Sequence, residues 1–464
     1  MKPLKIAACL FILTALTLTG FRCTRGVSPE AAQANRPVTL IWWRTLDDET
    51  AVRPIIEAYK TRHPNVTIEY RKLRLADYEP ELLNALAEDR GPDIMSIHNT
   101  WIDGYVSKLT PLPAELTLPF QTIQGTLKKE VVVELQTSPT LSARDLKNNF
   151  VDAVTKDVLL KTTPAQGAPV EQIYGLPLSL DTLVLYANRD LLNLAGIPEA
   201  PKTWSELQQA VKKLTKLDER GRLIQSGAAL GTSRNVENAS DILALLMMQN
   251  GAVMLDDSGT GAFHKNPTQS SRNTPAPGAQ ALAFYTDFAN PQKESYTWSA
   301  EEPNSLTAFV AGRTALFLGY AYHLPLIRAR VPRLNHTIAP APQIDGMPEV
   351  NFANYWVEAV SRKSPNQQWA WDFVQFATTQ NNVGAYLTAT GKPTALRALL
   401  NAQRATEDLA AFAGEALTAK SWYHGKNSRA ASAAMLDAID ATLNGASPQE
   451  TLNLTAQRIN QTLK

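Results

Sequence analysis

Apolar residues recur along the N-terminal part of the chain at two spacings, one typical of strands and one typical of helices. Residues 38–42 are apolar and β-branched, which predicts a strand. Residues 52–59 then place apolar side chains on one helical face, and residues 66–70 alternate as a half-buried strand does. A helix near residues 78–88 and a strand over residues 93–97 follow. Strands that alternate with helices predict βαβ units and a largely parallel sheet.

The same alternation returns after a stretch without a clear pattern. Residues 111–168 contain several prolines and short amphipathic pieces, which fit either a helical insertion or a surface excursion. A strand is expected over residues 182–186, and Thr203 with Glu206 has the spacing of a capping box at the start of a helix. A further strand is expected over residues 315–318. The C-terminal part of the chain is expected to be almost wholly helical.

Composition and charge exclude several classes of protein. The chain has 464 residues, of which 44% are hydrophobic and 19% charged, so two or three globular domains are expected. The formal net charge of +1, without a basic run, disfavours nucleic acid and membrane surfaces as partners of the body. Both cysteines, Cys9 and Cys23, lie near the N-terminus. The remaining chain therefore offers no disulfide framework, cysteine-ligated zinc site or cysteine nucleophile.

The first residues have the layout of a secretory signal. Lys2 and Lys5 form a short positive region, and residues 6–18 form an apolar stretch that is too short for a comfortable membrane span. Small and irregular residues follow. We therefore expect residues 1–22 to be a signal peptide and the protein to be exported.

Cys23 lies just beyond this apolar stretch and resembles the lipidated cysteine of bacterial lipoproteins. Arg22 departs from that pattern, which has a small residue before the cysteine. Lipidation of Cys23 predicts a cell-surface or periplasmic lipoprotein that is anchored to the membrane, with residues 23–37 as a disordered tether. A plain cleaved signal followed by an incidental Cys23 is the alternative.

Aromatic side chains mixed with amides and hydroxyls flank four of the predicted strands. In open α/β sheets ligands bind beyond the carboxyl ends of the strands, where the loops converge. A pyranose presents a face of C–H bonds to an aromatic ring and a rim of hydroxyls to polar groups, so this mixture suits a sugar. The predicted ligand-binding residues are Trp43, Arg44, Asn99, Trp101, Asp181, Trp298, Tyr320, Tyr322, Tyr355 and Trp356.

Some of these residues have specific expected roles. Trp42 is expected to face the core, which turns Trp43 the other way. Asp181 is expected to accept hydrogen bonds from ligand hydroxyls, and Arg44 is a possible bidentate partner of an acidic or hydroxylated ligand. Trp298 lies in a polar stretch and would either line the second lobe or sit in a loop.

Several motifs occur in the order and spacing of a known family. They are Gly91-Pro92-Asp93-Ile94, Ile173-Tyr174-Gly175-Leu176-Pro177, Tyr186-Ala187-Asn188-Arg189-Asp190-Leu191, Pro201-Lys202-Thr203-Trp204 and Phe309-Val310-Ala311-Gly312-Arg313. With them the chain resembles the extracellular solute-binding proteins of family 1, the maltose-binding-protein-like receptors of ABC importers. Residues 114–168 look longer than the corresponding segment of that family.

The resemblance implies an α/β, two-lobed periplasmic-binding-protein fold of type II. Each lobe would be a mostly parallel sheet flanked by helices, with a hinge between the lobes. The N-terminal lobe is expected to contain residues 38–110 and 313–355. Residues 111–170 would be an insertion or crossover region, and residues 171–312 and 356–464 would form the C-terminal lobe.

The resemblance also implies a function. The protein would capture a mono- or oligosaccharide between its lobes as a monomer and deliver it to permease subunits, without a cofactor or metal. The same fold could instead bind a phosphodiester, a polyamine or a peptide. A polysaccharide-active enzyme is disfavoured, because no catalytic motif is found and the six histidines are scattered without ligand spacing. A surface-adhesion module without an importer is a further alternative.

Overall fold

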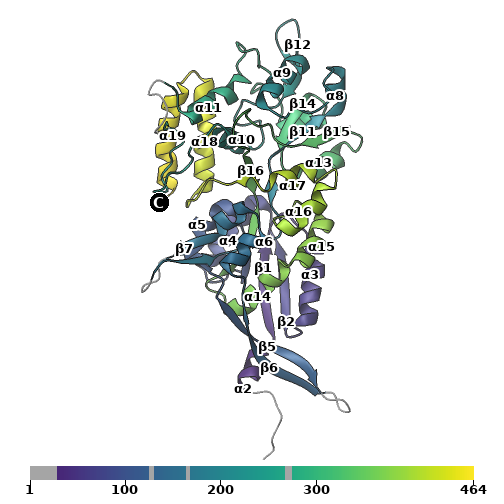
Figure 1. The fold of residues 1–464 in the computed structure, drawn as a ribbon, viewed down its shortest axis with the longest axis vertical. Coiled ribbons are helices and arrows are strands. Elements are labelled where there is room, and N and C mark those ends of the chain that lie inside the picture. Colours follow the sequence, from purple (N-terminus) through teal and green to yellow (C-terminus); the bar gives the residue numbers. More distant parts are fainter. Residues whose placement is uncertain (1–28, 125–129, 163–167, 267–273, 464) are drawn as a thin grey trace, which may run out of the picture.

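Two lobes, each with its own hydrophobic core, make up the molecule (Figure 1). The computed structural model describes residues 29–124, 130–162, 168–266 and 274–463. One large sheet lies in each lobe, and helices cover the faces of both sheets. The predicted two-lobed α/β fold is therefore confirmed.

The first lobe is built on a six-stranded mixed sheet. β1 lies parallel to β2 and β3, whereas β17 runs antiparallel to β3, β4 and β9. The strands, in sheet order, are β2 (Val66–Lys72), β1 (Val38–Arg44), β3 (Ile94–His98), β17 (Trp356–Ser361) and β4 (Leu109–Thr110), with β9 (Leu176–Pro177) also on β17. The helices of this lobe are α2 (Pro29–Ala34), α3 (Glu49–Arg62), α4 (Leu75–Ala87), η1 (Asn99–Trp101), α5 (Ile102–Tyr105), η2 (Val106–Lys108), α6 (Ala143–Asn149), α7 (Asp152–Val158), α14 (Gln367–Ala377), α15 (Gln380–Thr390) and α16 (Arg397–Arg404).

The second lobe is built on a five-stranded sheet that is also mixed. Only β13 and β14 pair in parallel there. The strands, in sheet order, are β12 (Lys216–Leu217), β13 (Leu223–Ala228), β14 (Thr314–Gly319), β11 (Val184–Asn188) and β15 (His336–Ala339). The helices are α8 (Arg189–Leu194), α9 (Trp204–Leu214), α10 (Ala239–Gln249), α11 (Pro277–Asp287), α12 (Ser305–Val310), α13 (His323–Arg330), α17 (Ala410–Glu415), α18 (Ser428–Leu443) and α19 (Pro448–Thr462).

The chain passes between the lobes three times. A small sheet of β10 (Asp181–Thr182), β16 (Asn351–Asn354) and β18 (Ala419–Lys420) holds one strand from each passage and lies where the two lobes meet (Figure 1). Because the passages are tied together by this sheet, they form a compact hinge region.

The predicted division of the chain between the lobes is wrong for two segments. Residues 313–355 were assigned to the N-terminal lobe, but β14 lies between β13 and β11 in the second sheet. Residues 356–464 were assigned to the C-terminal lobe, which holds for α18 and α19, but β17 lies in the first sheet against β3, and α14 packs on it. A sequence pattern indicates that a strand exists and does not indicate which strand pairs with it.

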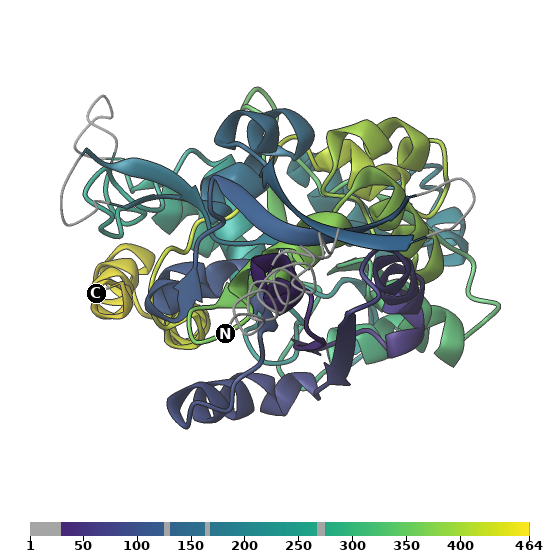
Figure 2. The ribbon, with the colours of Figure 1, turned by 90° about the horizontal axis from the view of Figure 1, so that it is seen from below.

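The segment of unclear pattern forms two hairpins and two short helices. The strands β5 (Glu115–Gln124) and β6 (Glu130–Pro139) make a long hairpin that extends away from the second lobe (Figure 1). Seen from below, this hairpin crosses the first lobe with α2 beside it (Figure 2). After α6 and α7, a second hairpin joins β7 (Leu159–Thr162) to β8 (Val170–Ile173).

Candidate functional site

A cavity of about 440 Å³ lies between the two lobes. The first lobe contributes Trp101 and Trp356 to its lining. The second lobe contributes Asn238 and Tyr322, while Asp181 enters from the hinge region. A ligand in this cavity would therefore contact both lobes at once.

The wall on the first lobe is aromatic and rigid. Register places Trp356 directly opposite His98 in the neighbouring strand β3, and Trp101 follows three residues after His98. The rings of Trp101 and Trp356 meet edge to face, with centroids 5.2 Å apart and planes at 76°. Trp101 also stacks on Tyr105, with ring centroids 5.9 Å apart and planes at 16°. Both indoles are only partly buried, so a ring face or edge is available to a ligand.

His98 supports this wall through two hydrogen bonds. Its Nε2 lies 3.0 Å from Asn354 Oδ1, and its Nδ1 lies 2.8 Å from Thr100 Oγ1. Burial lowers the pKa of His98, which favours the neutral imidazole. The histidine ring packs against the indole of Trp356, with centroids 5.3 Å apart, and so holds it in place. The neutral imidazole adds no charge to the cavity.

Two carboxylates from outside the first lobe face this wall. Asp181 accepts hydrogen bonds from the backbone N–H of Ala321 at 2.9 Å and from that of Thr182 at 2.9 Å. Burial outweighs these bonds and raises the pKa of Asp181 to about 7. Asp241, in the first turn of α10, accepts a 2.7 Å hydrogen bond from the Tyr320 hydroxyl, and burial raises its pKa as well. Within the described residues neither carboxylate forms an ion pair, so both can accept hydrogen bonds from a ligand.

Two residues with strained backbones line the cavity. Leu46 and Asn238 have φ values of 71° and 59°, which are rare for residues other than glycine. Asn238 also carries a buried Nδ2 that finds no hydrogen-bond partner in the described part of the chain. Strain of this kind persists where the surrounding structure enforces it, commonly at ligand sites. The side-chain amide of Asn238 at the N-terminus of α10 can therefore donate a hydrogen bond to a ligand.

Tyr322 provides an aromatic surface on the second lobe. Its side chain is 40% exposed and stacks on Tyr320, with centroids 5.8 Å apart and planes at 26°. Tyr320 itself is fully buried behind it. Aromatic rings therefore face the cavity from both lobes.

Five of the predicted ligand-binding residues line this cavity. They are Trp101, Asp181, Tyr322, Tyr355 and Trp356. Tyr355 is 2% exposed and donates a 2.7 Å hydrogen bond to Asp157, so it acts mainly as part of the packed floor. Tyr320 does not line the cavity and reaches it only through Asp241 and Tyr322.

Trp43 and Trp298 lie in the cores rather than in the cavity. Trp43 is 6% exposed, and the guanidinium of Arg71 lies 4.6 Å from its ring centroid. Trp43 was expected to point to the face opposite Trp42 and to contact the ligand, but it is buried because helices cover both faces of this sheet. Trp298 is fully buried in the second lobe and donates to Asn235 Oδ1 at 3.2 Å.

Arg44 and Asn99 are held by buried carboxylates of the first lobe. Arg44 is 4% exposed and forms ion pairs with Glu358 at 3.1 Å and Asp47 at 3.2 Å. Asn99 is 3% exposed and donates a 3.1 Å hydrogen bond to Asp157. Neither residue lines the cavity, although Arg44 Nη1 and Asn99 Oδ1 find no hydrogen-bond partner among the described residues.

The sequence prediction missed several residues of the cavity. Asn238 and Asp241 lie at the start of a helix, and Trp422 follows the two-residue strand β18. Lys392 lines the cavity while its Nζ binds Asp47 Oδ1 at 2.6 Å. A polar pair at the first turn of α10 was a signal that could have been used. No periodic pattern marks a strand as short as β18.

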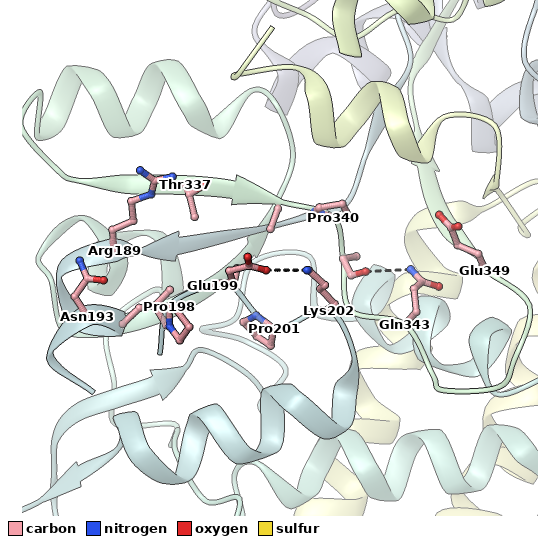
Figure 3. A pocket seen from close by; sticks show the side chains of 14 residues that line it. Arg189, Asn193, Pro198, Glu199, Pro201, Lys202, Thr337, Pro340, Gln343 and Glu349 are labelled. Carbon is pink, nitrogen blue, oxygen red and sulfur yellow. Dashed lines mark hydrogen bonds and ion pairs between the residues drawn. The ribbon is translucent and has the colours of Figure 1, made fainter. Parts of the chain in front are cut away.

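A larger hollow of about 690 Å³ lies on the second lobe alone, beside α8 and β15 (Figure 3). Its lining contains no aromatic residue. The charged ends of Lys202 and Glu199 bind each other at 2.7 Å across it. This hollow therefore lacks the aromatic faces that line the cavity between the lobes.

Within residues 29–124, 130–162, 168–266 and 274–463, no cluster of three His, Cys, Asp or Glu side chains could hold a metal ion. No helix in those ranges is both long and apolar enough to cross a bilayer.

Comparison with known proteins gives one family and many similar folds. The sequence profile of the bacterial extracellular solute-binding proteins matches residues 54–414. The structure is similar to the sugar-binding protein MalE of Xanthomonas citri, with a TM-score of 0.69 and 16% identity over 92% of this chain and 97% of the other. It is also similar to the cyclic α-maltosyl-1,6-maltose-binding protein of Arthrobacter globiformis (TM-score 0.69, 19% identity, 92% and 99% covered). A solute-binding protein of Thermotoga lettingae bound to α-D-tagatose gives a TM-score of 0.65 at 19% identity, with 92% and 100% covered.

Proposed function

Because the chain belongs to the bacterial extracellular solute-binding proteins, we propose that it is the ligand-capturing subunit of an ABC importer and that its ligand is a mono- or oligosaccharide. The observation that carries this proposal is the cavity between the lobes. Indole rings of the first lobe face carboxylate, amide and phenol groups of the second lobe and hinge across it.

Each part of a sugar has a suitable partner in that cavity. Trp101 and Trp356 can stack against the C–H face of a pyranose ring. Asp181 and Asp241 can accept hydrogen bonds from hydroxyls, and the unpaired amide of Asn238 can donate one. The structures of similar proteins bound to tagatose, maltotetraose and mannobiose support the choice of ligand class.

The proposal includes export and anchoring. Residues 1–22 would be removed as a signal peptide, and Cys23 would carry the lipid that holds the protein at the membrane. The receptor would act as a monomer and pass its ligand to permease subunits. The mass of the protein extracted from membranes tests the lipid, since a diacylglyceryl group on Cys23 adds a defined increment.

A thermal-shift screen tests the ligand class. A ligand that binds only the native protein raises its melting temperature, by an amount that grows with the ratio of free ligand concentration to Kd. We expect one or more mono- or oligosaccharides to raise it, and phosphodiesters, polyamines and peptides to leave it unchanged. A rise with one of these other solutes and with no sugar would contradict the sugar assignment and retain the receptor.

Substitution of the two indoles tests the site. Trp101→Ala and Trp356→Ala should each weaken sugar binding about 10- to 100-fold in titration calorimetry, because a stacked aromatic surface is lost. Trp101→Phe should recover part of the affinity. Phe284→Ala, a partly buried aromatic of the second lobe that packs on Trp204 outside the cavity, is the matched control. Equal affinity in all four proteins would refute the site.

A further inference from the structure

The hairpin β5–β6 exposes apolar side chains near its far end. Ile123 and Val131 are direct cross-strand partners and are 70% and 60% exposed. Leu135, 41% exposed, lies on the same face, because alternate pairs along an antiparallel ladder share a face. We call Ile123, Val131 and Leu135 the hairpin face.

The opposite face of the hairpin packs on the first lobe. Leu116 and Leu118 are buried against the first lobe, and the ring of Phe120 lies 5.2 Å from that of His63. Val133, which lies between Val131 and Leu135 on the hairpin face, is only 6% exposed, so Ile123 and Val131 form one exposed pair and Leu135 lies apart from it. An exposed pair of β-branched residues at the end of a two-stranded ribbon is an association surface that a protein in water normally protects with charge.

The N-terminal part of the chain reaches the molecule at this hairpin. α2 packs on both strands, and Gln121 Nε2 donates a 3.2 Å hydrogen bond to Asn35 Oδ1. Ala31 of α2 is 1% exposed, so the contact is close. Only five residues lie between Cys23 and Pro29, which begins α2, and the six steps from one to the other span about 20 Å when fully extended.

We propose that the hairpin face is a contact surface for a phospholipid bilayer, the one that carries the lipid anchor of this protein. The inference rests on the proposed anchor at Cys23 and is independent of the ligand. A lipid at Cys23, within about 20 Å of α2, keeps the hairpin at a high effective concentration near the bilayer. A small apolar face is then enough for the hairpin to bind the bilayer surface. The second lobe, which lies at the end of the molecule opposite the hairpin, would then be held away from the bilayer (Figure 1).

A fluorescent probe on the hairpin face tests the proposal without relying on lipidation in the cell. The chain from residue 24 onward contains every described residue and no cysteine. It is tethered by an N-terminal histidine tag to phosphatidylcholine vesicles that contain a nickel-chelating lipid. Ile123→Cys carries an environment-sensitive dye, and Leu194→Cys on α8, where Leu194 is 79% exposed, is the matched control.

Lipid contact predicts a blue-shifted emission at position 123 and at least about threefold stronger quenching by a lipid-borne quencher there than at position 194. Adding Val131→Asp to the Ile123→Cys protein should reduce quenching at position 123 to the level at position 194. Equal quenching at both positions, or quenching that Val131→Asp leaves unchanged, overturns the proposal. A blue shift without vesicles that grows with protein concentration also overturns it, in favour of a second copy on this face. Melting temperatures of the variants, with and without the sugar found in the ligand screen, separate these outcomes from misfolding and from failure of the ligand proposal.

Discussion

At the scale of the residue, Asp181 is the group in the cavity whose charge changes near neutral pH. Its carboxylate is buried, and the backbone N–H groups that bind it do not offset the loss of water. The pKa in the folded protein, about 7, lies above the ordinary value of 3.8. Folding therefore favours the protonated form, and the stability gained is full below about pH 4 and is lost as the pH rises through about 7.

Ligand binding should depend on pH in the opposite direction. If Asp181 accepts hydrogen bonds from ligand hydroxyls, the ionised form binds best, so affinity should rise about tenfold between pH 6 and pH 8. Titration calorimetry across this range measures the change. Asp181→Asn should bind more weakly and lose this step. If the variant keeps the wild-type pH profile, another group such as Glu415, with a pKa of about 8, is responsible.

The aromatic residues show what a sequence can specify at this scale. Trp101 and Trp356 could be predicted because polar residues surround them at strand ends, where loops converge. Trp43 has similar neighbours in sequence, but its ring is covered by Arg71 and by packed helices. Whether a ring at a strand end is covered depends on residues distant in the chain, which no local pattern contains.

At the scale of the element, local hydrogen bonds define the start of α9. Thr203 Oγ1 accepts from the backbone N–H of Glu206 at 3.1 Å, and the Glu206 carboxylate accepts from that of Thr203 at 3.3 Å. The predicted capping box is therefore confirmed.

Removal of this cap gives a prediction about stability alone. Thr203→Ala should lower the free energy of unfolding by about 1 kcal/mol, because the first turn of α9 loses a hydrogen-bond acceptor. A shift of the urea midpoint measures the loss, and Thr203→Ser should restore most of it. Sugar affinity should not change, since Thr203 lies outside the cavity. A fall in affinity with unchanged stability would contradict this assignment.

Strand partners and long hairpins are the part of the fold that the sequence did not reveal. β14 and β17 were recognised as strands but assigned to the wrong lobes, because pairing depends on how the chain returns through the hinge. β5 and β6 were not recognised, because Pro119 and scattered polar residues interrupt their alternation. Elements with strong local periodicity, such as α3 and β2, lie where the pattern predicted them.

At the scale of the whole molecule, ligand binding and lobe movement are coupled. The cavity takes its indoles from one lobe and Tyr322 and Asp241 from the other, so a ligand gains all its contacts only when the lobes approach. Arg429 on α18 and Glu79 on α4 form an ion pair of 3.2 Å between the lobes, and Arg429 lines the cavity. An interaction that forms only when the lobes have closed around the ligand stabilises the closed form and therefore strengthens ligand binding.

Breaking that bridge should weaken sugar binding modestly. Arg429 is 74% exposed, and exposed pairs contribute at most about 1 kcal/mol, so Arg429→Ala should lower affinity about two- to fivefold. The exchange Arg429→Glu with Glu79→Arg should restore it, which separates the bridge from a direct contact between Arg429 and the ligand. Arg458→Ala is the matched control, because Arg458 pairs with Asp437 within the second lobe. Since salt screens exposed charges, the difference between Arg429→Ala and wild type should shrink at high ionic strength. A difference that persists there would mean that Arg429 acts on the ligand and not on the lobes.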